Sequence, residues 1–311
     1  MQRRAFLGFA LTSCLPARRS SEEIERAIER EPSSDAPAPT SAPARARPHR
    51  AATTPLERHA EDLRTRWGED WTVLVESPFT VIGDESPELV ARHAEHTVRW
   101  AVARLKAEYF SADPDAIIDV WLLGSDASYQ RMSIEITGEA PDTPYGYYSR
   151  EHKALVMNIG TGGGTLVHEI VHPFMAANFP ASPSWFDEGL ASLYEQSSEH
   201  DGRIWGLTNW RLPDLQDAIT AKRVPSTKAL TETGDRPFYD DDPGTNYAQA
   251  RYLCMWLQEH GLLRDYYHAF VAAAGADPGG FATLRHIVGA KDMRVWDEKW
   301  RRWVMTLRFE S

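Results

Sequence analysis

The chain has 311 residues, 42% of them hydrophobic, which is enough to bury a sizeable core in one large domain or two modest ones. It carries 45 acidic residues against 34 basic ones, and this acidic balance argues against nucleic acid as a partner. The only cysteines are Cys14 and Cys254, so a disulfide framework and a cysteine-rich zinc module are both excluded. Any bound metal ion would have to rely on histidine and carboxylate side chains.

Residues 1–13 are predicted to be a signal peptide, with a basic start and an apolar run too short to span a bilayer. Residues 3–7, which begin with Arg3 and Arg4, resemble the twin-arginine signal, which implies export of an already folded protein. Residues 11–14 resemble the lipobox of bacterial lipoproteins, which implies cleavage before Cys14 and lipidation of that cysteine. Because Leu15 replaces the aspartate associated with inner-membrane retention, we expect the outer membrane or the cell surface. The alternative is a cysteine that lies near a cleavage site by chance.

Residues 14–55 form a predicted tether. The segment is built largely of Pro, Ala, Ser and Arg and has almost nothing to bury, so it cannot offset the entropy cost of folding. We expect it to be disordered and to connect a lipid anchor to the folded part.

A folded domain is predicted from residue 56 to residue 311. Its first part, 56–164, alternates strand and helix patterns, with Ser86 as the N-cap and Pro87 as the first residue of a long amphipathic helix. The predicted elements are a strand and turn at 71–83, helix 86–110, a buried strand at 116–124, helix 125–136, and two strands within 145–160.

The second part, 165–311, is predicted to be mainly helical. We expect helices at 165–178, 185–196, 213–221, 245–260, 262–274, 279–288 and 292–307. The fold class is therefore α+β, a small mixed sheet with helices followed by a mainly helical half.

The first helix of the second part carries the most informative motif, H-E-x-x-H. His168 and His172 are four residues apart, so on a helix they present both imidazoles on one face, with Glu169 beside the first. Neutral imidazole suits zinc, and a catalytic zinc takes three protein ligands. Pro173 follows at once and is expected to bend or loosen the helix just after His172.

A third ligand is found by reading downstream. The pattern that places a histidine six residues after His172 fails, because Asn178 stands there. Residues 183–195 instead contain Trp185 followed by Glu188-Gly189, which resembles the second-helix motif of the gluzincin metallopeptidases. Gly189 would let two helices approach closely. Over roughly 140–260 the chain is similar to the small peptidase MA-like group of bacterial gluzincins.

The resemblance implies a zincin-like fold with the metal site between the two halves. It implies Zn²⁺ on His168, His172 and Glu188, with Glu169 as the general base that activates water for peptide-bond hydrolysis. It also implies a tyrosine that stabilises the oxyanion. Tyr247 matches best, and Tyr252 is the second choice.

Several questions about the site remain open from the sequence. Some gluzincins orient a ligand histidine with an acid four residues after the glutamate, where this chain has Ser192. Asp187, Glu195 or a backbone carbonyl could serve instead, although Asp187 is expected to point outward or to cap the helix. We expect an exposed loop around His200 and a solvated turn at 239–244. Strand 154–158 is expected to lie along the cleft and to pair with an extended peptide.

Two functional classes follow. The first is a zinc metallopeptidase with a protein or peptide substrate, anchored to the membrane by lipid and monomeric. The second is a catalytically idle envelope lipoprotein that keeps the zincin fold as a binding or assembly module. In a third interpretation the two histidines only pack in a helix, and Glu188 is only a carboxylate favoured by the dipole at a helix N-terminus. The presence of both motifs in the expected order argues against this interpretation.

Overall fold

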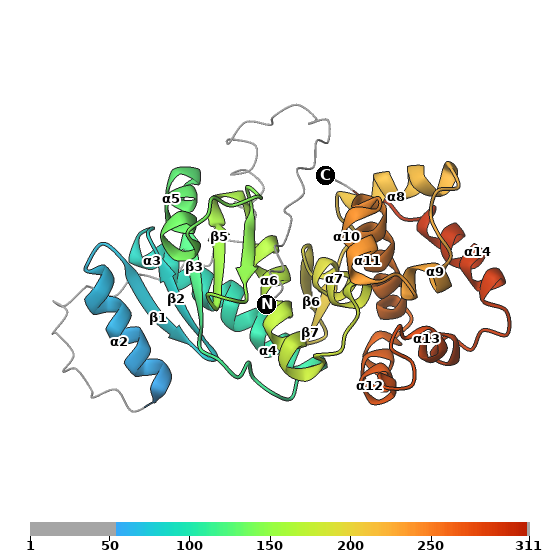
Figure 1. The fold of residues 1–311 in the computed structure, drawn as a ribbon, viewed down its shortest axis with the longest axis horizontal. Coiled ribbons are helices and arrows are strands. Elements are labelled where there is room, and N and C mark those ends of the chain that lie inside the picture. Colours follow the sequence, from blue (N-terminus) through green and yellow to red (C-terminus); the bar gives the residue numbers. More distant parts are fainter. Residues whose placement is uncertain (1–53, 310–311) are drawn as a thin grey trace, which may run out of the picture.

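The computed structural model describes residues 54–309 (Figure 1). The predicted signal peptide, Cys14 and the predicted tether up to residue 53 lie outside the described residues. The first helix, α2 (Pro55–Trp67), begins one residue before the boundary expected from the sequence. Thr54 caps it, since its hydroxyl accepts from the Glu57 amide while the Glu57 side chain accepts from Thr54.

The first half contains a small mixed sheet, as predicted, and this sheet has five strands. Its strands are β1 (Thr72–Glu76), β2 (Phe79–Gly83), β3 (Ile118–Leu123), β4 (Gly146–Ser149) and β5 (Ala154–Asn158). In space the order is β1-β2-β3-β5-β4, with β2, β3 and β5 parallel and both outer pairs antiparallel. Strand β5 is therefore internal and β4 lies at the edge. The expectation that residues 154–158 pair with a peptide is wrong, because both sides of β5 are already hydrogen-bonded.

Helices cover both faces of the sheet. One face packs on α2 and on α5 (Asp126–Thr137) through alternate residues such as Ile82, Trp121 and Val156. The other face packs on α3 (Pro87–His93), a π-helical turn (Ala94–Arg99), α4 (Trp100–Glu108) and α6 (Gly164–Asn178). The predicted helix 86–110 is thus a continuous helical stretch with a π turn in its middle, and Ser86 and Pro87 take their predicted positions.

The second half is mainly helical, as expected. Its helices are α6, α7 (Ser184–Leu193), α8 (Arg211–Thr220), α9 (Thr227–Thr231), α10 (Asp235–Asp240), α11 (Pro243–Glu259), α12 (Leu263–Ala273), α13 (Phe281–Ile287) and α14 (Met293–Val304). The sequence analysis did not predict α2, α9, α10 or the small hairpin of β6 (Ser197–His200) and β7 (Arg203–Gly206). His200 is exposed, as expected, but it lies in β6 rather than in a loop.

The two halves share one hydrophobic core. Figure 1 shows the sheet and its helices on one side, α8 to α14 on the other, and α6 and α7 between them. A single cluster of buried side chains runs from sheet residues such as Val120 through Ile170 of α6 to Phe186 and Phe270. The shared core fixes α6 and α7 in position from both sides.

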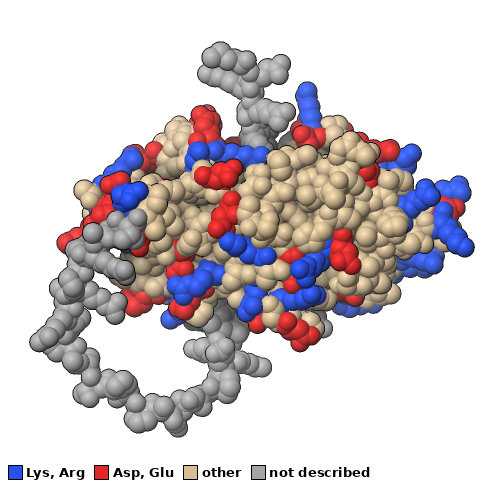
Figure 2. All heavy atoms as spheres, turned by 90° about the horizontal axis from the view of Figure 1, so that it is seen from below, with Lys and Arg blue, Asp and Glu red and all other residues tan. Residues whose placement is uncertain are grey.

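The surface carries charges of both signs. Figure 2 shows one face, on which lysine and arginine alternate with aspartate and glutamate around a mostly uncharged area. Within residues 54–309, no helix combines the length and apolar character that crossing a membrane requires.

Candidate metal centre

Helix α6 carries both histidines of the H-E-x-x-H motif on one continuous helix. It runs from Gly164 to Asn178, and Pro173 lies inside it without ending it. Proline has no N–H, so the carbonyl of Glu169 one turn earlier has no helical donor. His168 and His172 both precede the proline, and the helix stays continuous through the turn in which this hydrogen bond is missing.

Two glycines determine how the chain enters α6. Gly162 has a φ of 112°, a conformation that glycine adopts readily. A Cβ at Gly164 would overlap the backbone carbonyl of Glu195, so the helix begins in direct contact with that segment. The glycine run therefore places the start of α6 beside Glu195, whose side chain turns out to contact His168.

Helix α7 presents Glu188 from the opposite side. Trp185 and Phe186 are fully buried, as expected, and fix the first turn of the helix in the aromatic core. Gly189 does allow a close approach, but the neighbour is α11: a Cβ at Gly189 would lie 3.0 Å from the carbonyl of Ala250. Helix α11 thus supports the back of α7 while Glu188 faces α6.

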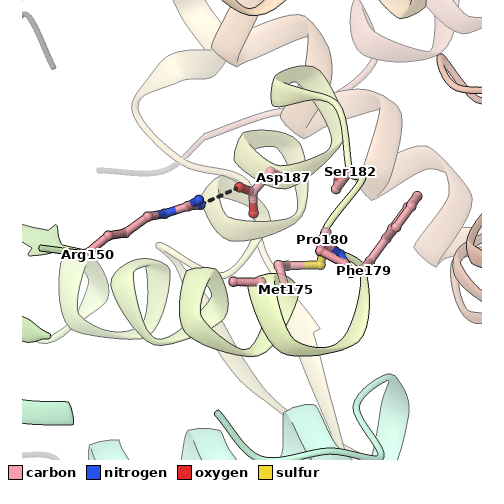
Figure 3. Close-up of a pocket in the computed structure, with 7 residues that line it drawn as sticks. Arg150, Met175, Phe179, Pro180, Ser182 and Asp187 are labelled. Atoms are coloured by element: carbon pink, nitrogen blue, oxygen red, sulfur yellow. Dashed lines mark ion pairs between the residues drawn. The ribbon is translucent and has the colours of Figure 1, made fainter. Parts of the chain in front are cut away.

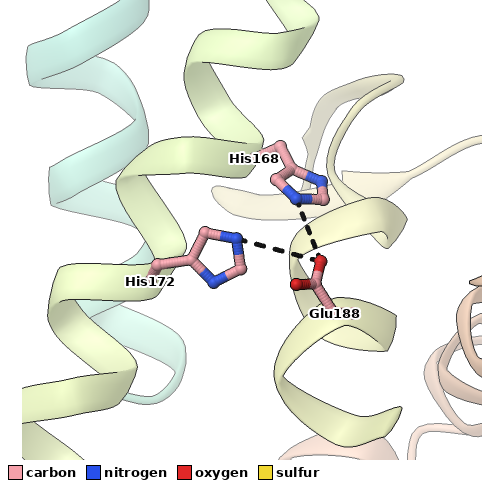
Figure 4. Close-up of side chains that lie close together, drawn as sticks. All are labelled: His168, His172 and Glu188. Atoms are coloured by element: carbon pink, nitrogen blue, oxygen red, sulfur yellow. Dashed lines mark ion pairs between the residues drawn. The ribbon is translucent and has the colours of Figure 1, made fainter. Parts of the chain in front are cut away.

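The three predicted ligands converge in space (Figure 4). The Nε2 atoms of His168 and His172 lie 3.3 and 3.9 Å from Oε2 of Glu188. One ligand atom from each residue falls within 4.8 Å of the others, and all three residues are buried. Zinc bonds of 2.0–2.1 Å in a tetrahedron separate neighbouring ligand atoms by about 3.3 Å. The three residues lie close enough to bind a metal ion, and this donor set suits zinc.

Each histidine has a carboxylate on its other ring nitrogen. Nδ1 of His168 lies 3.3 Å from Oε1 of Glu195, and Nδ1 of His172 lies 3.2 Å from Oδ1 of Asp187. The hydrogen bond to Asp187 favours the tautomer of His172 with the proton on Nδ1, which leaves Nε2 free to coordinate. The contact of His168 with Glu195 is close but lacks the geometry of a hydrogen bond. The sequence had left open whether Asp187, Glu195 or a backbone carbonyl contacts the ligand histidines. Asp187 points inward, so the expectation that it faces outward or caps the helix is wrong.

Each of these carboxylates in turn contacts an arginine. Arg211 holds Glu195 with two hydrogen bonds, of 3.0 and 2.8 Å, and Asn209 donates a third of 2.9 Å. Arg150 approaches Asp187 at 3.7 Å. The site therefore contains two chains of the form histidine, carboxylate, arginine.

These contacts set the charges of the site in the absence of metal. Burial alone would lower the pKa of both histidines, but the facing carboxylates outweigh it, so the pKa of His168 and of His172 lies above its usual value. Burial would raise the pKa of Glu188, yet the two imidazoles lower it to about 2. Glu188 is thus held as a carboxylate, the form that binds a metal ion.

Glu169 lies beside the three ligands and next to the sheet. The backbone N–H of Tyr148, on edge strand β4, lies close enough to the Glu169 carboxylate to lower its pKa slightly. Burial raises the pKa of Glu169, and the two histidines only partly offset this. A carboxyl group whose pKa lies closer to neutrality is better suited to accept and return a proton.

Two tyrosines of the helical half approach the site. Tyr239 on α10 donates a 2.9 Å hydrogen bond to Oε1 of Glu188, leaving Oε2 toward the histidines. Tyr247 on α11 packs against Tyr239, and burial followed by the charge of Glu188 raises its pKa well above the usual value. The hydroxyl of Tyr252, the second choice from the sequence, accepts a hydrogen bond from the backbone N–H of Asn209.

Sequence reasoning missed Tyr239 because it treated residues 239–244 as a solvated turn. The aromatic pair Phe238-Tyr239 just before the acidic run was the available signal. Comparison with protein-family models finds no match, and comparison with curated protein sequences finds none. The interpretation of the site therefore rests on its own geometry.

Proposed function

We propose that this protein is a zinc-dependent metallopeptidase of the gluzincin type. The observation that carries the proposal is the convergence of two Nε2 atoms and one carboxylate, with each opposite Nδ1 backed by a second carboxylate. A pair of histidines that merely packed in a helix would not need this arrangement of acids.

The residues of the chain suit hydrolysis of an amide bond. When bound, zinc supplies a Lewis acid that lowers the pKa of water and polarises a carbonyl oxygen. Glu169 accepts the proton of the attacking water and returns it to the leaving amine nitrogen. The hydroxyl of Tyr247, which stays protonated at neutral pH, donates a hydrogen bond to the oxygen on which negative charge develops.

Edge strand β4 can bind an extended peptide by strand addition. Its outer side is not paired within the sheet, and its Tyr148 amide already touches Glu169. An extended substrate can add to such an edge through main-chain hydrogen bonds. The bond to be cut would then lie beside the proton acceptor, and recognition would depend on the backbone more than on side chains.

We further propose that the chain acts as a monomeric envelope lipoprotein, lipidated at Cys14 and exported through the twin-arginine route. The support is the sequence before residue 15, which lies outside the described residues. Its test is mass spectrometry of the mature N-terminus, where diacylglycerol on Cys14 supports the proposal and an unmodified N-terminus contradicts it.

The peptidase proposal is tested with casein and a peptide library. The zinc-loaded full chain should cleave them, a chelator should abolish cleavage, and Glu169→Gln should reduce kcat by about 10²–10⁴-fold while zinc stays bound. One equivalent of zinc with no hydrolysis of any peptide would instead favour the idle zincin-fold binding module.

A further inference from the structure

A small pocket lies next to the candidate metal centre, on the side of His172. It is about 120 Å³ in volume, room for about four waters at ~30 Å³ each. Asp187, the partner of His172, forms part of its wall, so a group bound here is one side chain away from the metal ligands. The lining residues are Arg150, Met175, Ala176, Phe179, Pro180, Ser182 and Asp187.

The only cation in this lining is Arg150. Figure 3 shows its side chain reaching from the sheet side of the pocket toward Asp187 on α7. The two groups are 3.7 Å apart, too far for a hydrogen bond, and the Arg150 side chain is 58% exposed. Among residues 54–309 no acceptor takes a hydrogen bond from its guanidinium. Its fork of N–H donors is therefore available to a ligand.

The other walls decide what that ligand can be. Met175, Phe179 and Pro180 give an apolar floor with no further charge. Asp187 directs Oδ1 to His172 through a hydrogen bond and Oδ2 toward Arg150 without one, so a bound anion would share the Arg150 guanidinium with Asp187. A small planar anion can displace the waters and accept two N–H bonds from the guanidinium, a geometry that carboxylates match.

We propose that Arg150 is a specificity-determining residue that binds a carboxylate of the peptide substrate in this pocket, a proposal that rests on the peptidase function. Arg150 directly follows edge strand β4, whose Tyr148 amide contacts Glu169. A peptide extended along β4 would therefore pass the pocket within a few residues of the cut. The carboxylate is that of an acidic side chain or of the peptide C-terminus.

The test uses one set of synthetic peptides in matched forms. Each carries Glu or Gln near the cut, and a free or an amidated C-terminus, so that the two sources of carboxylate are separated. With the zinc-loaded full chain, kcat/KM for one acidic form should exceed that of its neutral twin by about tenfold to a hundredfold. Arg150→Met should abolish this preference and Arg150→Lys should retain part of it.

The control variant is Arg294→Met. Arg294 lies on α14, is 91% exposed, and pairs with Asp292 there, so its removal should leave the preference unchanged. Equal cleavage of acidic and neutral twins by the parent, or a preference that survives Arg150→Met, would overturn the carboxylate proposal while leaving the peptidase function intact.

A binding experiment keeps the test decisive if no peptide is cleaved. Zinc-loaded Glu169→Gln protein is titrated with the same peptides by calorimetry. Tighter binding of an acidic form, lost on adding Arg150→Met, would support the pocket even though hydrolysis had failed. Equal binding of acidic and neutral twins would reject the pocket independently of catalysis.

Discussion

The two ligand histidines are supported by similar chains in different surroundings. His168 leads to Glu195 and then to Arg211, whose side chain is 19% exposed and makes two short hydrogen bonds. His172 leads to Asp187 and then to Arg150, which is 58% exposed and makes one loose contact. The first, which we call the buried chain, holds the Glu195 carboxylate firmly through Arg211 and Asn209, although the contact of His168 Nδ1 with Glu195 is not itself a hydrogen bond. The second, which we call the outer chain, ends in Arg150, whose guanidinium can bind a ligand in the pocket.

The largest effect on stability and zinc affinity should come from a substitution that interrupts the buried chain of His168, Glu195 and Arg211. Glu195→Ala leaves Arg211 buried without its anion and His168 without its partner. Removing one partner of a buried pair costs about 3–5 kcal/mol, and losing an outer partner of a ligand histidine costs about 10–100-fold in metal affinity. Denaturant unfolding and zinc titration measure the two effects. If the free energy of unfolding stays within about 1 kcal/mol of that of the parent, the buried chain does not stabilise the fold.

The buried chain also ends beside Tyr247, whose ring lies 5.3 Å from the guanidinium carbon of Arg211. Tyr247→Phe keeps the ring and removes only the hydroxyl, so stability and zinc affinity should stay unchanged. If this hydroxyl stabilises the oxyanion, kcat falls by about 10²–10³-fold. Tyr239→Phe is the contrasting variant, because it removes a hydrogen bond to Glu188 and should weaken zinc binding. An unchanged kcat in Tyr247→Phe would refute the assignment of Tyr247.

A substitution that interrupts the outer chain should change metal affinity much more than stability. Asp187→Asn weakens the hold on His172, so zinc affinity should fall by about 10–100-fold. The contact with the 58% exposed Arg150 contributes only about 0–1 kcal/mol to folding. The free energy of unfolding should therefore fall by less than in Glu195→Ala, with the lost hydrogen bond to His172 as the main cost. A loss of stability as large as that of Glu195→Ala would show that the two chains do not differ as described.

The smallest expected effect is a pH trend of the metal-free protein. The pKa of Glu188 is lowered from 4.5 to about 2, so its contribution is present above pH 4.5 and is lost as the pH falls toward 2. The pKa of both histidines is raised above 6.5, so their contribution is present below pH 6.5 and is lost as the pH rises through the folded-state pKa. Chelator-treated protein should therefore lose this stabilisation above pH 6.5.

Zinc should show the opposite trend, because the metal ion binds neutral imidazole and competes with protons. Thermal unfolding from pH 6 to 8 should give a falling Tm with chelator and a widening gap between zinc-loaded and zinc-free protein. Asp187→Asn should reduce the part of the trend that comes from His172. A gap that narrows as the pH rises would contradict the histidine assignment.

The ligands were predictable because their signal is local. The spacing of His168 and His172 fixes a shared helical face, and Glu188 follows within one helix-turn-helix unit. Their supporting acids were not predictable from spacing. Glu195 lies beyond the end of α7, and its close backbone contact with Gly164 at the start of α6 helps to bring it to His168. Tertiary packing, rather than helical periodicity, selects it.

The fold shows the same limit. The elements with strong periodicity were predicted closely, whereas the order of β4 and β5 was not, because a hairpin can join a sheet through either strand. The β6–β7 hairpin was missed because it is polar and short. Tertiary contacts stabilise it, including paired hydrogen bonds between Gly206 and the Gln258 side chain. The local sequence pattern alone therefore predicts neither the order of β4 and β5 nor the β6–β7 hairpin.

The central claim is that His168, His172 and Glu188 together hold one zinc ion. Metal analysis of the purified full chain beside Glu188→Ala tests it most directly, with Glu199→Ala, an exposed acid of β6, as the matched control. We predict one equivalent of zinc in the parent and the control and less than about a tenth of an equivalent in Glu188→Ala after dialysis against a weak chelator. Zinc retained at one equivalent in Glu188→Ala would show that the ligand set is wrong.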